Sequence, residues 1–115
     1  MNNSGFEELK VWQLSQDIAF SIYQKFNSNK DFGFKDQIQR AAVSISNNIA
    51  EGYDRNYKNE FKRFLWISKA SCGEVKSMLF LAERLQYISK DEKTNLLKEC
   101  DQVSRMIFGL IKSLG

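Results

Sequence analysis

The sequence predicts an all-α protein that folds as one domain. The chain has 115 residues, no proline and six glycines, and its apolar side chains, 43% of the total, are spread along its whole length. Four segments repeat apolar residues every three or four positions, which is the period of an amphipathic helix. Because the connections between them are short, successive helices run antiparallel, and we expect an up-down-up-down four-helix bundle. Residues 6–115 form this domain, after a disordered N-terminal tail over residues 1–5.

The composition excludes several kinds of site. Histidine is absent, which removes His-assisted catalysis and the Glu-x-x-His ligands of helical di-iron proteins. Cys72 and Cys100 have neither CxxC spacing nor companions, so we expect buried free thiols in a reducing compartment. No apolar run approaches the roughly 18 residues of a membrane span, and the N-terminus lacks the order of a signal peptide. We expect a soluble, cytoplasmic, non-enzymatic protein without cofactor or metal.

The first two predicted helices cover about residues 6–27 and 34–52. The first has an apolar stripe nearly half a circumference wide, and a face of that width often meets two neighbours. The second has unusually small side chains, which let a partner helix approach closely, and Gly52 is a natural C-terminal stop. The stripe of the first consists of Val11, Trp12, Leu14, Ile18, Ala19, Ile22, Tyr23 and Phe26. The small residues of the second are Ala41, Ala42, Ser44 and Ser46, and its larger core residues are Phe34, Ile38, Ile45 and Ile49.

The third and fourth predicted helices have heptad patterns. The third covers about residues 57–87, and its seam alternates spacings of three and four. The fourth opens with Ser89 and Glu92 in capping-box register and keeps the same alternation to Leu114. The seam of the third consists of Phe61, Phe64, Ser68, Ser71, Val75, Met78, Ala82 and Leu85. That of the fourth consists of Leu96, Cys100, Val103, Ile107, Leu110 and Leu114.

A second apolar line on the third helix faces away from much of its core. Isolated exposed aromatics need no explanation, but two large rings flanking small residues on one line indicate a contact surface. With the wide stripe of the first helix, this line predicts a homo-oligomer. The predicted interface residues are Trp12, Tyr23, Trp66, Ala70, Gly73 and Phe80.

Positive charge is concentrated near the start of the third helix. The stretch from Asp54 to Lys76 holds six basic residues against three acidic ones, so the whole net charge of +3 lies there. A basic row of this kind can follow a phosphate backbone, and an oligomer would repeat it in every copy. A solvated face is the alternative. The candidate nucleic-acid-binding residues are Arg55, Lys58, Lys62, Arg63, Lys69 and Lys76.

Polar residues form a second candidate site. Arg40, Asn48 and Glu51 lie along the second helix, and Glu74 sits at the margin of the third-helix seam, where it is a natural partner for Arg40 within the bundle or across a subunit boundary. We hypothesise a half-buried network that fixes which helices or subunits face one another. The alternatives are a solvated polar face and paired catalytic carboxylates at Glu51 and Glu74, although no nucleophile, metal ligand set or phosphate loop accompanies them.

Three stretches resemble a known family. They are FEELKVWQ (residues 6–13), QIQRAAVSISNNIAEGYDR (residues 37–55) and NEFKRFLWIS (residues 59–68). The chain resembles, from about Phe6 to Leu114, the four-helix bundle proteins encoded in intervening sequences of bacterial 23S rRNA genes. The family commonly has proline where this chain has Ser46, so helix 2 is expected to be straighter here.

The resemblance implies a left-handed antiparallel bundle that assembles into a homopentamer. Similar proteins include the basic accessory proteins of diversity-generating retroelements, which associate with nucleic acid and with a reverse transcriptase. No enzymatic activity is attached to the family. The family-matching residues are expected to be structural or interface residues, and they are Arg40, Asn48, Glu51, Gly52, Phe61, Arg63 and Phe64.

Together these observations predict a non-enzymatic homo-oligomer that binds RNA or DNA with low sequence specificity. A scaffold that binds protein only is the alternative. A small-molecule enzyme is a third class, for which Arg40, Glu51 and Glu74 are weak candidates.

Overall fold

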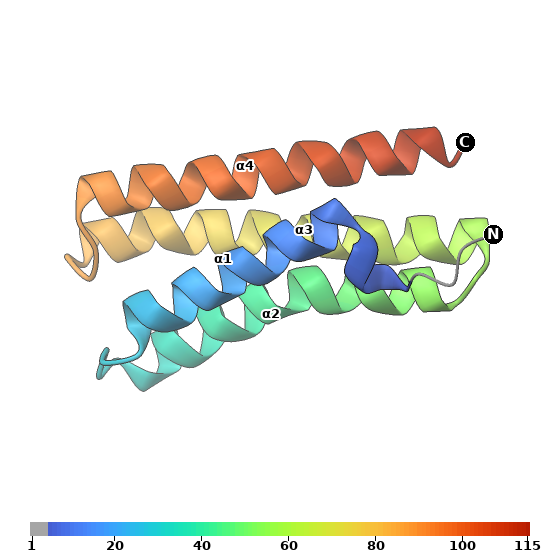
Figure 1. Cartoon of the computed structure of the whole chain (residues 1–115). Helices are drawn as coiled ribbons and strands as arrows, with labels where there is room; N and C mark the ends of the chain where they lie inside the picture. Colours follow the sequence, from blue (N-terminus) through green and yellow to red (C-terminus); the bar gives the residue numbers. More distant parts are fainter. Residues whose placement is uncertain (1–4) are drawn as a thin grey trace.

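The computed structural model describes residues 5–115, which form four α-helices and one short 3-10 helix and contain no strand (Figure 1). The elements are η1 (Phe6–Glu8), α1 (Lys10–Phe26), α2 (Phe32–Asp54), α3 (Lys58–Arg84) and α4 (Lys90–Ser113). The helices pack into a rod of 47 × 21 × 20 Å. The α1–α2 and α3–α4 turns lie at one end of the rod, and the α2–α3 turn lies at the other. The predicted all-α fold of four packed helices is confirmed.

The start of the chain differs from the prediction. The predicted disordered tail, residues 1–5, lies outside the described residues except for Gly5, which precedes η1. The helix predicted from Phe6 is wrong over its first turn, because Leu9 is extended and separates η1 from α1. The chain turns back there, so that the Phe6 ring lies 5.2 Å from the Trp12 ring. The side-chain amide of Gln13 fixes this turn by donating to the Glu7 carbonyl at 2.9 Å.

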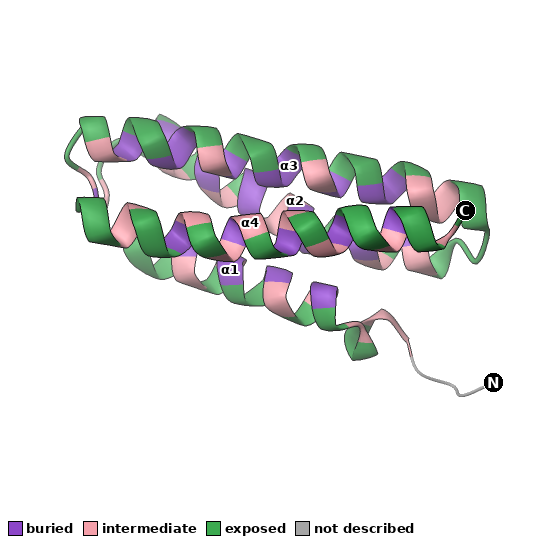
Figure 2. Cartoon of the chain, turned by 90° about the horizontal axis from the view of Figure 1, so that it is seen from above, coloured by how far each residue is buried: buried purple, intermediate pink, exposed green. Residues whose placement is uncertain are grey.

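The buried residues of the four helices form one core cluster, and Figure 2 shows them in purple along the ribbons. Every predicted core residue of α2 is buried. On α3 the prediction found only one of two buried stripes, because Leu65, Cys72 and Leu79 are also fully buried. A helix that packs against two neighbours needs both stripes, and α3 packs against α2 and α4. Leu85 was wrongly placed in the seam: it follows the last turn of α3 and is 44% exposed.

The small residues of α2 do allow neighbouring helices to approach closely. The buried Ser68 hydroxyl of α3 donates to the Ile45 carbonyl of α2 at 2.7 Å. Nearby, the hydroxyls of Ser44 and Ser71 are 2.8 Å apart. A side chain larger than serine at these positions would separate the two backbones. Among the helix pairs of the described chain, α2 and α3 have the most extensive contact.

Ser46, where the resemblance led us to expect proline, contacts α1, the other neighbour of α2. It is fully buried and accepts a hydrogen bond from the Gln16 side chain of α1 at 2.9 Å. The residue also keeps its backbone inside an unbroken α2, since the helix runs through it from Phe32 to Asp54. A hydroxyl here therefore links α1 to α2, a contact that proline has no group to make.

Gly52 is not the helix stop that the sequence predicted. The helix continues to Asp54, and the chain reverses at Asn56, whose φ is 62°. Gly52 is buried, and a Cβ atom there would lie 2.6 Å from the Phe64 Cβ and 3.3 Å from the Phe61 carbonyl oxygen. The residue is glycine because α3 passes too close for any side chain.

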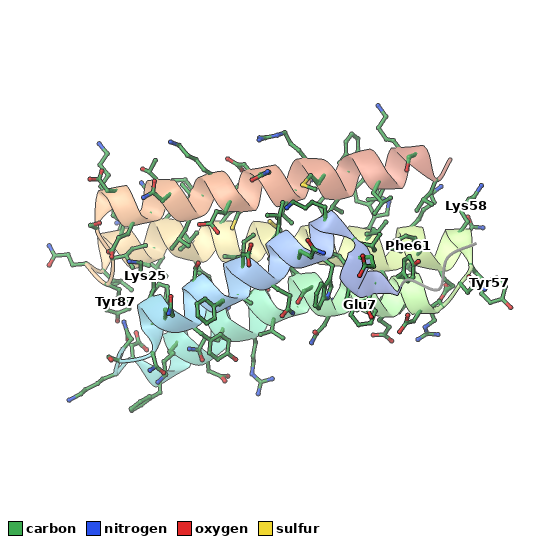
Figure 3. The ribbon with its side chains drawn as sticks, in the orientation of Figure 1. Glu7, Lys25, Tyr57, Lys58, Phe61 and Tyr87 are labelled. Carbon is green, nitrogen blue, oxygen red and sulfur yellow. The ribbon has the colours of Figure 1, made fainter. Side chains whose placement is uncertain are left out.

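The α3–α4 turn and the adjacent end of the rod are closed by specific hydrogen bonds. Gln86 has a φ of 62°, and the Tyr87 amide reaches back to the Ala82 carbonyl at 2.8 Å, as in a Schellman helix end. The capping box predicted at Ser89 and Glu92 is confirmed. Across the same end, the Tyr87 hydroxyl donates to Asp31 at 2.6 Å (Figure 3). None of the described helices combines the length and the hydropathy needed to cross a membrane.

Candidate nucleic-acid interface

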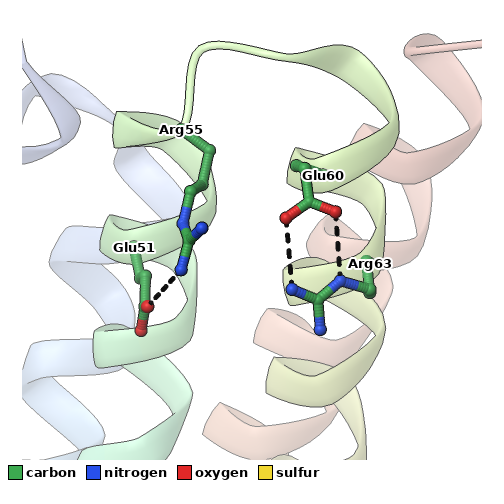
Figure 4. Close-up of polar contacts among 4 residues, drawn as sticks. All are labelled: Glu51, Arg55, Glu60 and Arg63. Atoms are coloured by element: carbon green, nitrogen blue, oxygen red, sulfur yellow. Dashed lines mark hydrogen bonds and ion pairs between the residues drawn. The ribbon is translucent and has the colours of Figure 1, made fainter.

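Two of the six predicted phosphate-binding cations are engaged at the α2–α3 turn. Arg55, just after α2, forms an ion pair with Glu51 at 3.0 Å. Arg63 of α3 donates two hydrogen bonds to Glu60, at 3.1 and 3.2 Å. Figure 4 shows the two pairs on neighbouring helices. The hydrogen bonds between Arg63 and Glu60 lower the pKa of the glutamate and raise the pKa of the arginine.

Both guanidinium groups also lie against one aromatic ring. The guanidinium carbons of Arg55 and Arg63 are 5.1 and 4.5 Å from the centroid of the Phe64 ring, within cation–π range. The turn thus brings together residues that carry the sequence resemblance: Glu51, Gly52, Phe61, Arg63 and Phe64. Their contacts are with one another, which assigns this part of the motif to the α2–α3 turn itself.

The other four predicted cations differ in their partners. Lys76 forms an ion pair with Asp101 of α4 at 2.5 Å, and this hydrogen bond raises the pKa of the lysine. Lys62 donates to the backbone oxygen of Gly115 at 3.0 Å and forms no ion pair with an acidic side chain. Lys58 and Lys69 form no ion pair with a carboxylate of the described residues. Acidic side chains therefore pair with three of the six cations, and three have no such partner among the described residues: Lys58, Lys62 and Lys69.

Helix α4 supplies two cations that the sequence analysis did not single out. Arg105 and Lys112 line a groove of about 550 Å³ together with Lys69 of α3. Neither forms an ion pair with a described carboxylate. The remaining lining residues are Ser104, Phe108 and Gly109. The sequence did place Asp101, Arg105, Phe108 and Lys112 on one face of a helix by their spacing. It did not reveal that this face borders the basic row of α3.

Two exposed aromatic rings lie among these cations. Trp66 of α3 and Phe108 of α4 pack edge to face with their centroids 6.1 Å apart, and they remain 49% and 43% exposed. The ammonium group of Lys112 lies 5.6 Å from the Phe108 centroid. We call this set the basic-aromatic seam: Lys62, Trp66, Lys69, Arg105, Phe108 and Lys112. It presents positive charge around two accessible rings.

The predicted interface residues mostly lie on the surface of the chain. Tyr23 is 45%, Trp66 is 49% and Phe80 is 51% exposed, and Ala70 and Gly73 are exposed with them. Trp66 therefore belongs both to the predicted subunit contact and to the basic-aromatic seam. A Cβ atom at Gly73 would meet no atom within 4 Å, so α3 is open there. Trp12 differs, because it is partly buried against the core and the Phe6 ring. Whether a second copy covers this surface stays a prediction.

The residues of the predicted polar network have other partners within the bundle than the suggested Arg40–Glu74 pair. Arg40 pairs instead with Asp36 at 2.9 Å, and Glu74 accepts a hydrogen bond from Gln37 at 3.3 Å. Arg40 and Asp36 sit on the same α2 turn with side chains 79% and 66% exposed, so water screens both charges. Arg40 and Glu74 are therefore not paired with each other within one chain. A link between Arg40 and Glu74 across a subunit boundary stays a prediction.

Three of the four network residues nevertheless share a shallow hollow of about 410 Å³ on α2. Asn48 donates to the Ser44 carbonyl at 2.8 Å and so is held by its own helix. The hollow is lined by Tyr23, Arg40, Val43, Ser44, Asn47, Asn48 and Glu51. It is open and polar, and the carboxylate of Glu51 is already paired with Arg55. The lining residues include no second carboxylate beside Glu51.

The two cysteines are free and fully buried, as predicted. The Cys72 thiol donates to the Cys100 carbonyl at 3.2 Å, across the α3–α4 contact. The neighbouring Cys72 thiol and burial raise the pKa of the Cys100 thiol. Both thiols therefore pack as small apolar side chains. Within residues 5–115, no cluster of three or more histidine, cysteine or acidic side chains has the arrangement of a metal site.

The half-buried carboxylate of Glu99 on α4, near Asp17 of α1, gives a pH-dependent prediction. Burial, and then repulsion from Asp17, raises the pKa of Glu99 above 4.5. Because the folded state prefers the protonated form, this group lowers the stability of the protein as pH rises above about 4.5. Glu99→Gln should raise Tm at pH 7 by about 1 to 3 °C, a small change because water partly solvates the side chain.

Thermal unfolding followed by circular dichroism at pH 4 and pH 7 measures this effect. The gain from Glu99→Gln should shrink at pH 4, where the glutamate is largely protonated in both the folded and the unfolded state. An equal gain at both pH values would contradict the electrostatic cause and leave only a packing effect.

The chain is similar in sequence and in fold to known proteins. The model of the 23S rRNA-intervening sequence protein family matches residues 7–109. A crystal structure of a protein of unknown function from the S23 ribosomal protein family of Bacteroides thetaiotaomicron has a similar fold, with a TM-score of 0.83 and 25% sequence identity. The match covers 89% of this chain and 98% of that one. No functionally curated protein matches. Since the family model spans most of the sequence, the chain belongs to the 23S rRNA-intervening sequence protein family.

Proposed function

We propose that the protein is a non-enzymatic, cytoplasmic homo-oligomer that binds RNA or DNA through phosphate groups at the basic-aromatic seam. One observation carries the proposal: four cations from two helices lie along this seam, and none of them forms an ion pair with an acidic side chain of the described residues. Phosphate is the ligand that such a surface attracts, because binding releases the counterions condensed on the nucleic acid. The binding is therefore strong at low salt and weak at high salt.

The site favours low sequence specificity. Base sequence in a duplex is read by side chains that enter a groove, whereas contacts with phosphates only position the nucleic acid. The seam lies along the side of a rod, and its four cations are on two packed helices. Lysine and arginine side chains on such a surface reach phosphates from outside the duplex.

The proposal includes an up-down-up-down bundle as the building block and a homopentamer as the assembly. The support comes from the exposed outer surface of α3, which carries Ala70, Gly73 and Phe80, continues to Leu81 and Leu85 and has few charges. Such a surface is typical of a subunit contact. In an assembly each copy repeats the seam, so a single nucleic acid contacts several weak sites at once. Its overall affinity is then higher than the affinity of one site.

A protein-only scaffold is the second candidate. It is favoured by the ion pairs of Arg55, Arg63 and Lys76, which leave half of the predicted basic row compensated. An exposed apolar surface then becomes the main recognition feature of the chain. The two candidates differ in whether the protein binds nucleic acid at low ionic strength.

The test of nucleic-acid binding compares cations with and without partners. The variant Lys62→Gln/Lys69→Gln/Arg105→Gln loses three charges of the seam, and we expect its affinity for a labelled duplex to fall by at least about 10-fold, with a shallower salt dependence. The matched variant Arg55→Gln/Arg63→Gln/Lys76→Gln has the same net charge. It should lose several-fold less affinity, because these cations already bind carboxylates.

Fluorescence anisotropy with the intact oligomer, in roughly 50 and 200 mM salt, measures both variants on structured RNA and duplex DNA. No binding by the wild type at the lower salt concentration would end the nucleic-acid proposal and leave the scaffold. Equal losses in the two variants would show that net charge matters and the seam does not.

A further inference from the structure

We propose that the seam binds unpaired nucleotides, with a base stacked on the exposed face of Phe108. The adjacent phosphates would contact Lys69, Arg105 and Lys112. This inference rests on the proposed function and narrows its ligand from nucleic acid in general to single strands with accessible bases.

The arrangement of rings and charges supports a base rather than phosphates alone. A site built only for phosphates needs no aromatic residues, but here Phe108 lies within the groove among three cations. Its ring is held on one side by the edge-to-face contact with Trp66 at 6.1 Å. Charged grooves that carry exposed aromatic rings are typical of proteins that bind single strands, because every base has a face that can stack.

The solvent side of Phe108 is available to a ligand. The ring is 43% exposed, and the group above it is the mobile ammonium of Lys112, 5.6 Å from the centroid. A lysine at this distance over an exposed ring is held weakly. When a base takes its place, the same ammonium can contact the phosphate of that nucleotide, so the charge stays at the site.

The groove beside the ring is open. A Cβ atom at Gly109 would have no atom within 4 Å, and the volume of about 550 Å³ lies within the range of small-molecule sites. Gly109 is in the interior of α4, where alanine favours the helix more than glycine does. Packing within the chain does not require glycine at position 109. Access of a flat ligand to Phe108, however, requires that no side chain fills the groove at this position.

A duplex cannot use this feature. Its bases are stacked on one another, so only its phosphates reach a protein surface of this shape. An unpaired strand offers both phosphates and base faces to the seam. The inference therefore predicts a preference that depends on the bases and not on the charge of the ligand.

The experiment measures the anisotropy of end-labelled oligonucleotides of equal length bound to the intact oligomer. The four ligands are single-stranded oligo(A) as DNA, the same strand as RNA, an abasic DNA strand with the same phosphates, and a duplex. We expect both oligo(A) strands to bind at least about 10-fold more tightly than the abasic strand. The ratio of the RNA and DNA affinities tells which strand is preferred.

Two variants locate the effect. Phe108→Ala removes the stacking surface, and Gly109→Leu fills the groove while keeping the ring and all the charges. Each should lower the affinity for oligo(A) by about 10-fold, to the level of the abasic strand. The control is Gln102→Leu, which adds a leucine at another exposed position of α4. It should bind as the wild type does, and circular dichroism checks that each variant is folded.

Equal binding of oligo(A) and abasic strands by the wild type would overturn the inference, and so would a duplex that binds as tightly as oligo(A). Either result leaves phosphate binding at the seam intact. Absence of binding to all four ligands at low salt would instead overturn the proposed function as well.

Discussion

Gly52→Val is expected to lower the free energy of unfolding by about 3 kcal/mol and the Tm by roughly 12 °C. A Cβ atom at this position would lie 2.6 Å from the Phe64 Cβ and 3.3 Å from the Phe61 carbonyl oxygen. The Phe64 Cβ is fixed by the backbone of α3, so a rotamer change of one side chain cannot remove the clash at 2.6 Å. To accommodate the valine, α2 and α3 must move apart near Gly52. These two helices have the most extensive contact of any helix pair in the described chain.

Gly109→Val is the matched control for this prediction. It makes the same change in helix propensity, but a Cβ at Gly109 would have no atom within 4 Å. Its stability should stay within about 0.5 kcal/mol of the wild type. Urea unfolding followed by circular dichroism compares the two variants. Equal stability of both would show that the α2–α3 distance does not depend on Gly52.

Gly73→Glu is expected to convert the oligomer into single folded chains. Gly73 is exposed and open in the described chain, so a glutamate can be accommodated by the isolated bundle. In a contact between copies the same side chain would place an unpaired charge among Ala70, Gly73 and Phe80 of an apolar surface. We expect the free energy needed to bury that charge in every copy to exceed the free energy gained from a contact between small residues.

Light scattering coupled to size-exclusion chromatography measures the mass. The wild type should have about five times the chain mass of 13.4 kDa, and Gly73→Glu should have the mass of one chain. Gly109→Glu carries the same change outside the predicted interface and should keep the mass of the wild type. A wild type that runs as a single chain at high concentration would contradict the oligomer at once.

Much of the fold was predictable because periodicity determines which side of a helix is buried. The buried residues Phe34, Ile38, Ile45 and Ile49 of α2 follow directly from their spacing. The second stripe of α3 was missed because a single heptad pattern describes contact with one partner, while Leu65 and Leu79 contact another. Gly52 was misread because a glycine near a helix end has two explanations, and the sequence does not contain the distance to Phe64.

The candidate site was less predictable, because charge compensation depends on contacts between helices. Lys76 looked like Lys69 in the sequence, yet only Lys76 meets an aspartate of α4. The pairing of Arg63 with Glu60 was readable from their spacing, but the shared contact of Arg55 and Arg63 with Phe64 was not. Arg105 became part of the site only through the position of α4 beside α3.

The unequal lengths of α1 and α3 give the molecule two chemically different ends. Helix α1 has 17 residues and α3 has 27, which correspond to about 26 and 41 Å. Helix α1 is thus too short to cover the end of the rod that carries Lys58 and Lys62. At the opposite end, where Figure 3 labels Tyr87 and Lys25, Tyr87 contacts Asp31 and Lys25 contacts Glu92. Copies related by rotation about one axis all point the same way along it. A ring of these rods would consequently have two different rims, with the α2–α3 turn of every copy at one rim and the Tyr87–Asp31 contact of every copy at the other.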